Sequence, residues 1–183
     1  MRQLTATAPG VVEWLEVPEP ALQDAGDAIV RPIAVARCDI DLPMLRGQTP
    51  FTLPIALGHE FVAEIVELGD AVSGVRPGQR VVVPFQVSCG ACEFCGRGLT
   101  NSCRTTGGRA QFGFGASGGD LGGALADLVR VPFAQHMLVP LPDGVAPSAV
   151  ASADNIADGW RTVGPYLQEQ ADTAVLVVGG GAV

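Results

Sequence analysis

Residues 89–103 read CGACEFCGRGLTNSC and bring four cysteines, Cys89, Cys92, Cys95 and Cys103, into fifteen positions. Four thiols separated by two, two and seven residues are typical of a closed tetrahedral zinc site, which folds a small lobe and takes no part in catalysis. The alternatives are a chance cluster of buried cysteines, or two disulfides with one of the five cysteines left over. Because the N-terminus, MRQLT, shows no secretory signal, metal is the better interpretation. We therefore predict a zinc lobe at residues 88–104.

The composition limits what this chain can do. It has 183 residues, of which 48% are hydrophobic, so a real core can form. A net charge of −8 argues against a nucleic-acid partner. No apolar run approaches the length of a membrane-spanning helix. We therefore expect a cytoplasmic protein that binds neither nucleic acid nor membrane.

The chain up to residue 141 has the texture of an all-β barrel or sandwich. Short apolar runs alternate with turns, and there are fourteen prolines and 24 glycines. A long irregular stretch from Ser88 to Gly123 interrupts this pattern and contains the cysteine cluster. His136 lies in a region of predicted strands, directly before the one at 137–141, and is interpreted as a core or surface residue. The predicted strands are residues 11–17, 28–37, 61–68, 80–83, 125–131 and 137–141.

The texture changes after residue 145. A helix is predicted from Pro147 to Val163, because proline suits a first helical position. Residues 174–178, AVLVV, predict a strand buried on both faces. Gly179 and Gly181 then match the start of a dinucleotide-binding turn, and the alternative is a simple glycine-rich tail. The third glycine of that turn would be the next residue, so we expect the N-terminal part of a longer protein.

A second set of possible zinc ligands lies outside the cluster. Cys38 stands alone, and His59 and Glu60 follow Gly58. A cysteine, a histidine and a carboxylate can form an open zinc site, which leaves a position for substrate. Considered singly, Cys38 could be a small buried hydrophobe and His59 a structural histidine.

The order of these features resembles the zinc-containing medium-chain alcohol dehydrogenases. It comprises Cys38, then Gly58-His59-Glu60, Gly69, the segment PGQRV at residues 77–81, and the four clustered cysteines. The resemblance implies a mainly β fold: a GroES-like β-barrel catalytic domain at residues 1–145, then at 146–183 connecting helices and the first strand of a truncated Rossmann domain.

The same resemblance implies a function. It indicates hydride transfer between an alcohol, aldehyde or ketone and NAD or NADP, with one catalytic and one structural zinc ion. The complete enzyme would be a homo-dimer or homo-tetramer acting on a small molecule, and this fragment alone would be inactive. The alternative is a stand-alone GroES-like zinc-binding module with a structural or binding role. A zinc-free quinone reductase is disfavoured, because such relatives generally lack the ligand cysteines.

The resemblance also implies roles for single residues. Cys38 and His59 match the first two ligands of the catalytic zinc, and Glu60 matches a neighbouring carboxylate that binds the metal in some members. Asp154 matches the third ligand, although an aspartate there could instead cap a helix. Asp41 matches a carboxylate that supports the zinc-binding histidine.

The sequence departs from the family pattern at the proton relay. Ile40 stands where the family has serine or threonine, and isoleucine cannot pass a proton. Asp158 replaces the threonine beside the nicotinamide, so we predict that Asp158, Asp39 or a water chain takes over the relay. The alternative is that Asp158 only caps a local helix or faces solvent.

Overall fold

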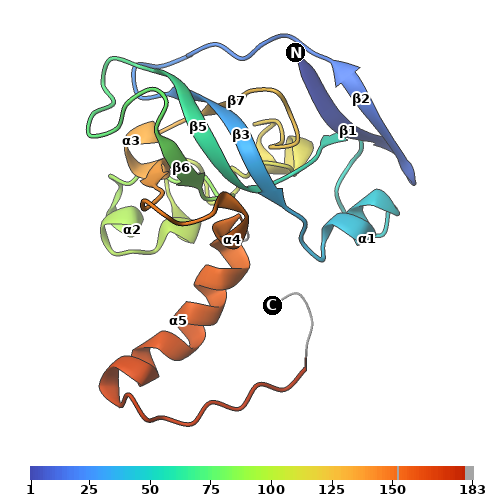
Figure 1. The fold of residues 1–183 in the computed structure, drawn as a ribbon. Coiled ribbons are helices and arrows are strands. Elements are labelled where there is room, and N and C mark those ends of the chain that lie inside the picture. Colours follow the sequence, from blue (N-terminus) through green and yellow to red (C-terminus); the bar gives the residue numbers. More distant parts are fainter. Residues whose placement is uncertain (152, 180–183) are drawn as a thin grey trace.

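The structure of the protein is a computed structural model that describes residues 1–151 and 153–179. It is mainly β, with two antiparallel sheets (Figure 1). The smaller sheet has the order β2-β1-β4 and the larger one the order β7-β3-β5-β6-β8. The strands are β1 Arg2–Ala8, β2 Val11–Glu16, β3 Ala28–Ala36, β4 Ile55–Ala56, β5 Glu60–Leu68, β6 Arg80–Val83, β7 Val129–Val131 and β8 Val139–Pro140.

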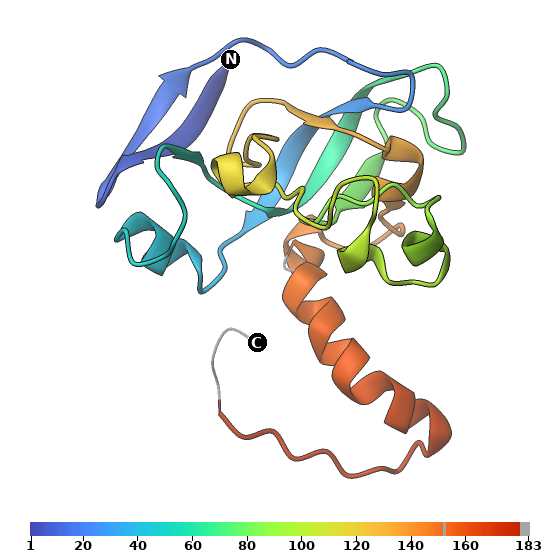
Figure 2. The same ribbon diagram turned by 180° about the vertical axis from the view of Figure 1, so that it is seen from behind.

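Helices are short except for the last one. In chain order they are α1 Asp41–Leu45, α2 Glu93–Gly96, the 3-10 turns η1 Thr100–Ser102 and η2 Gly115–Gly118, α3 Ala134–Met137, α4 Pro147–Val150 and α5 Ala153–Glu169. Figure 2 shows α5 extending away from the sheets on the side where α4 lies. Within residues 1–151 and 153–179 we find no helix with the length and hydropathy that a bilayer crossing requires.

The central strand β5 shows the predicted alternation from Ala63 to Val66, whereas its first four residues, Glu60–Ala63, are buried on both faces. Phe61, Ala63 and Ile65 are buried on one face, where Phe61 packs edge-on against Phe112 at 5.6 Å between ring centroids. Glu64 points to the other face and forms an ion pair of 3.1 Å with Arg31 of β3. Burying one face drives the sheet to cover its core, so the period-two pattern fixes the register of β5.

Backbone hydrogen bonds join strand β1 of the smaller sheet to the segments around Leu57 and Leu125. The N–H of Leu57 donates to the carbonyl of Leu4 at 2.9 Å, and the N–H of Leu4 donates to Leu125 at 2.8 Å. Leu125 in turn donates to Leu57 at 2.9 Å. Three segments far apart in sequence therefore meet at one seam, which lies directly before His59.

Several sequence predictions of strands need correction. The sequence did not predict β1 or the two-residue β4, and only the last three residues of 125–131 are in a strand. His136 lies in helix α3, not in a strand. Phe133 adopts a left-handed φ of +53° and its carbonyl accepts the N–H of Met137 at 3.0 Å, so a helical turn replaces the start of the predicted strand.

In the C-terminal part the predicted helix forms and is longer than expected, whereas the predicted strand does not form. Pro147 is in the first turn of α4 as predicted, but the helical region continues past Val163 to Glu169, with Pro165 inside α5. Residues 174–178 form no strand in the described part of the chain, and Leu176 is 87% exposed. A strand needs a partner for its backbone groups, and no described strand pairs with this segment. Gly179 has a φ of +105°, while Gly181 lies outside the described residues.

Candidate metal centres

The four clustered cysteines converge in the lobe formed by α2 and η1. Their sulfur atoms all lie within 4.8 Å of one another, and Cys92 and Cys103 are 4.0 Å apart. All are free thiols rather than disulfides. Zinc–sulfur bonds of about 2.3 Å in a tetrahedron place sulfurs about 3.8 Å apart. The separation therefore fits one zinc ion and excludes disulfide pairing in this structure.

Hydrogen-bond donors of the lobe point at these sulfurs. The N–H of Cys89 donates to Cys103 at 3.4 Å, and the N–H of Cys92 donates to Cys89 at 3.3 Å. The hydroxyl of Thr105 donates to Cys89 at 3.2 Å. Such donors favour the thiolate form, which is the form that binds metal.

The acidities of the four thiols differ. Burial raises the pKa of Cys103, but hydrogen bonds from Thr106 and the Cys89 N–H outweigh it and bring that pKa to about 5. The backbone N–H of Cys95 lowers the pKa of Cys92 to about 7. Burial raises the pKa of Cys95 itself to about 11. A cation is therefore needed before all four can be thiolates at neutral pH.

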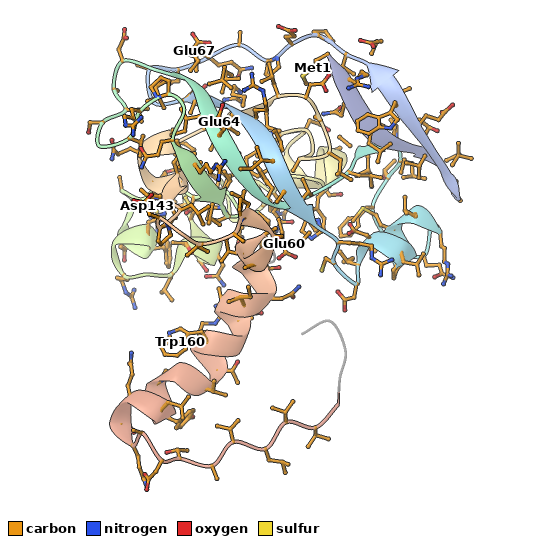
Figure 3. The ribbon with its side chains drawn as sticks, in the orientation of Figure 1. Met1, Glu60, Glu64, Glu67, Asp143 and Trp160 are labelled. Carbon is orange, nitrogen blue, oxygen red and sulfur yellow. The ribbon has the colours of Figure 1, made fainter. Side chains whose placement is uncertain are left out.

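A second cluster forms where β3 and β5 lie side by side. Ala36, at the end of β3, pairs with Glu60 at the start of β5, so Cys38 and His59 emerge from neighbouring strand ends. The ligand atoms of Cys38, His59 and Glu60 all lie within 4.8 Å of one another. Figure 3 shows Glu60 at the end of β5 that faces the start of the C-terminal helices.

The turn that leads into this cluster requires glycine. Gly58 has a φ of +92°, and a Cβ placed there would lie 2.9 Å from the backbone nitrogen of Leu125. Any L side chain would both strain the backbone and meet a neighbouring chain segment. Gly58 therefore lets the chain pass the seam and turn His59 inward.

His59 is buried among polar groups that fit a cation. It is 2% exposed, with Nε2 3.7 Å from Glu60 Oε1 and Nδ1 3.8 Å from Asp41 Oδ1. Within the described part of the chain, Nδ1 has no hydrogen-bond partner. Asp41 Oδ2 accepts the N–H of Cys38 at 2.8 Å, so one carboxylate holds the backbone of Cys38 and lies beside His59 without a hydrogen bond to it. Thiol, imidazole and carboxylate are donors that zinc takes, so these residues fit the metal.

Asp154 lies beside this cluster. Its backbone N–H donates to Glu60 Oε2 at 3.2 Å. Across residues 1–151 and 153–179, the group of ligand atoms within 4.8 Å comprises Cys38, His59 and Glu60, and does not include the Asp154 carboxylate. Burial raises the pKa of Asp154, and the nearby Asp158 raises it further. The structure thus places Glu60 next to the two ligands, while the ligand role of Asp154 stays a prediction.

Asp158 is one turn further along α5. Its carboxylate forms an ion pair of 2.5 Å with Arg161, and its side chain is 49% exposed. Both Asp158 and Glu60 line a cleft of about 610 Å³ between the end of β6, η1 of the lobe and α5. Asp158 therefore reaches the cleft but already has a cationic partner.

Sequence reasoning missed the aromatic walls beside His59. The rings of Phe85 and Phe114 lie 6.0 and 5.3 Å from the imidazole, measured between centroids, and Phe51 packs on Phe114 at 5.1 Å. Ile40 packs against the same apolar cluster. The glycine-rich run around Phe114 was the only signal, because residue type alone does not say which phenylalanines meet a metal site.

The described part of this mainly β domain thus has two groups of side chains that could each hold a metal ion: the four thiols of the lobe, and the separate thiol, imidazole and carboxylate cluster. Residues 24–143 match the family model described as alcohol dehydrogenase GroES-like domain. The chain belongs to this family.

Relatives of the chain are oxidoreductases by name. A probable zinc-binding alcohol dehydrogenase of Mycobacterium tuberculosis is 37% identical over all of this chain and 46% of its own length. A medium chain reductase/dehydrogenase of Acremonium sp. is 39% identical over 91% of this chain and 57% of its own length. Alcohol dehydrogenase TADH from Thermus sp. ATN1 has a TM-score of 0.79 and 34% identity, covering 88% of this chain and 47% of its own. The chain thus spans about half the length of the relatives it matches.

Proposed function

We propose that the chain supplies the catalytic zinc domain of an oxidoreductase that transfers a hydride between an alcohol, aldehyde or ketone and NAD or NADP. The observation that carries the proposal is the cluster of the partly exposed Cys38 with the buried His59 and Glu60, at the edge of a cleft that Glu60 lines. Family membership and the relatives named as zinc-type alcohol dehydrogenases support it.

The residues of the chain have distinct parts in this proposal. Cys38, His59 and a carboxylate, either Glu60 or Asp154, would hold the catalytic zinc. Asp41 orients His59 and fixes the backbone at Cys38. When bound, the metal would act as a Lewis acid on the substrate oxygen.

The walls of the site would control water. The rings of Phe85 and Phe114 lie beside His59 and exclude water there. The lower local dielectric constant strengthens the charge interactions at the site. Ile40 offers no proton path there, so the proton would leave through Asp158, Asp39 or water.

The nicotinamide cofactor would bind largely outside the barrel. We propose that Gly179 and Gly181 belong to the turn that approaches its pyrophosphate. Two similar structures are described as bound to NADP and as complexed with NADH, which supports a nicotinamide cofactor without choosing between the two.

Metal analysis and turnover test the proposal together. The purified chain of 183 residues should hold two zinc ions, and Cys38→Ser should retain only the lobe zinc, while Cys89→Ser should lose the lobe zinc. The chain alone should not oxidise alcohols, whereas the complete product of its gene should. Two zinc ions with no oxidoreductase activity in the complete product would favour a stand-alone zinc-binding module. A full zinc complement in Cys38→Ser would disprove the ligand assignment.

A further inference from the structure

Helix α3 lies against the four-cysteine lobe although it is more than thirty residues away in sequence (Figure 1, Figure 2). Nε2 of His136 and Oγ of Ser88 are 3.0 Å apart and share a hydrogen bond. The next residue, Met137, accepts the N–H of Ser88 on its sulfur at 3.4 Å. Ser88 is 3% exposed, so α3 holds both the side chain and the backbone of the residue before Cys89.

The imidazole of His136 also packs against Gly90. A Cβ added at Gly90 would lie 2.6 Å from Cγ of His136, and the φ of Gly90 is +72°. A glycine is thus needed at this position both for the backbone conformation and for the approach of the ring. His136 therefore contacts the residue before Cys89 and the residue after it.

The segment held by α3 is the one whose backbone donors face the sulfurs. The N–H of Cys89 donates to Cys103 at 3.4 Å. The N–H of Gly90 donates to the sulfur of Cys95. Fixing residues 88–90 therefore fixes two backbone donors that point at ligand sulfurs.

We propose that His136 is a positioning residue for the zinc lobe: through Ser88 and Gly90 it holds the backbone of the first ligand, Cys89, in its metal-binding geometry. His136 would touch neither zinc nor substrate. It would slow the release of zinc from the four-cysteine site, because a ligand whose backbone is held in place moves away from the metal less readily.

The experiment measures zinc release from the purified chain into a chromophoric chelator. His136→Ala should speed release from the lobe about 3- to 10-fold, the factor expected for one hydrogen bond. Cobalt in place of zinc separates the two sites spectroscopically, and the Cys38, His59 and Glu60 site should release its metal at an unchanged rate. His136→Gln, which keeps a side-chain donor within reach of Ser88, should recover much of the effect.

Two further variants separate positioning from general damage. Gln135→Ala on the same helix removes the hydrogen bonds from Ser73, at 2.7 and 3.0 Å, and should leave release from the lobe unchanged. Ser88→Ala combined with His136→Ala should release zinc no faster than His136→Ala alone, because both changes remove one interaction. Wild-type release from His136→Ala would overturn the proposal, and so would equal acceleration at both metal sites or by Gln135→Ala.

Discussion

Replacing Asp41 with alanine should weaken metal binding at the proposed site of Cys38, His59 and Glu60 while leaving the lobe intact. The carboxylate accepts the Cys38 N–H at 2.8 Å and stands 3.8 Å from His59 Nδ1. Its loss frees the backbone of one candidate ligand and removes the anion beside another. We therefore expect lower zinc affinity at this site, with little change in the overall fold, since Asp41 lies on a five-residue helix at the surface of the domain.

The size of the effect can be estimated in two ways. A hydrogen bond to a charged group contributes about 1.5–3 kcal/mol, which corresponds to roughly 10- to 150-fold in affinity. Groups that brace a metal ligand typically contribute about 10- to 100-fold. The two estimates overlap, so we expect a loss of about 10- to 100-fold for Asp41→Ala, and a smaller loss for Asp41→Asn, which retains an acceptor oxygen.

Competition with a graded series of zinc chelators measures this affinity, and the four-cysteine lobe serves as an internal reference in the same sample. Glu67→Ala is the matched control, because it removes the same charge from an exposed position on β5. An affinity within twofold of wild type for Asp41→Ala would refute the bracing role. Equal losses at both sites would indicate general unfolding instead.

Three other outcomes follow from the structure. Phe61→Ala should lower the free energy of unfolding by about 3–5 kcal/mol, because Phe61 is fully buried. Val66→Ala, at a 36% exposed position on the same strand, should change it by under about 0.5 kcal/mol. Urea titrations at saturating zinc measure both. The Arg2 backbone N–H, 2.7 Å from Asp127, lowers the pKa of that carboxyl in the folded state, so ionised Asp127 stabilises the fold above its ordinary pKa, and this stability is lost as the pH falls through the lowered pKa. Asp127→Asn should therefore lower Tm at pH 7 and match wild type in acid. A difference in Tm that does not change with pH would contradict this linkage. If the complete gene product has the proposed dehydrogenase activity, Asp158→Asn should reduce its turnover by about 10²- to 10⁴-fold with zinc content unchanged, while near-wild-type kinetics would leave Asp158 only its ion pair.

The four-cysteine site shows how much local spacing can predict. Its four cysteines fall within fifteen residues, so closing the loop between them costs little entropy and the pattern alone predicts a metal site. The strands at 28–36 and 60–68 could also be predicted, because short apolar runs rich in valine and isoleucine and bounded by turn residues indicate strands. The family resemblance rested on these same local motifs, and the match over residues 24–143 confirms it.

Other elements could not be predicted because their conformation depends on distant partners. The two-residue strand β4 exists only through its pairing with β1. Residues 174–178 have the apolar composition of a buried strand, yet they stay exposed because no described strand pairs with them. His136 falls in a helical turn rather than the strand its neighbours suggest, because Phe133 turns the chain into the left-handed region.

The sequence by itself determined the mainly β character, the zinc lobe and the residue types of the second metal cluster. Only the tertiary structure decided that the pairing of Ala36 with Glu60 brings Cys38 to His59, that Glu60 is the carboxylate grouped with both, and that Phe114 and His136 contact the two sites. Residue chemistry and spacing along one strand or loop are local properties of the chain. Which distant segments meet is set by the shared burial of a core and the pairing of backbone groups, which no single segment encodes.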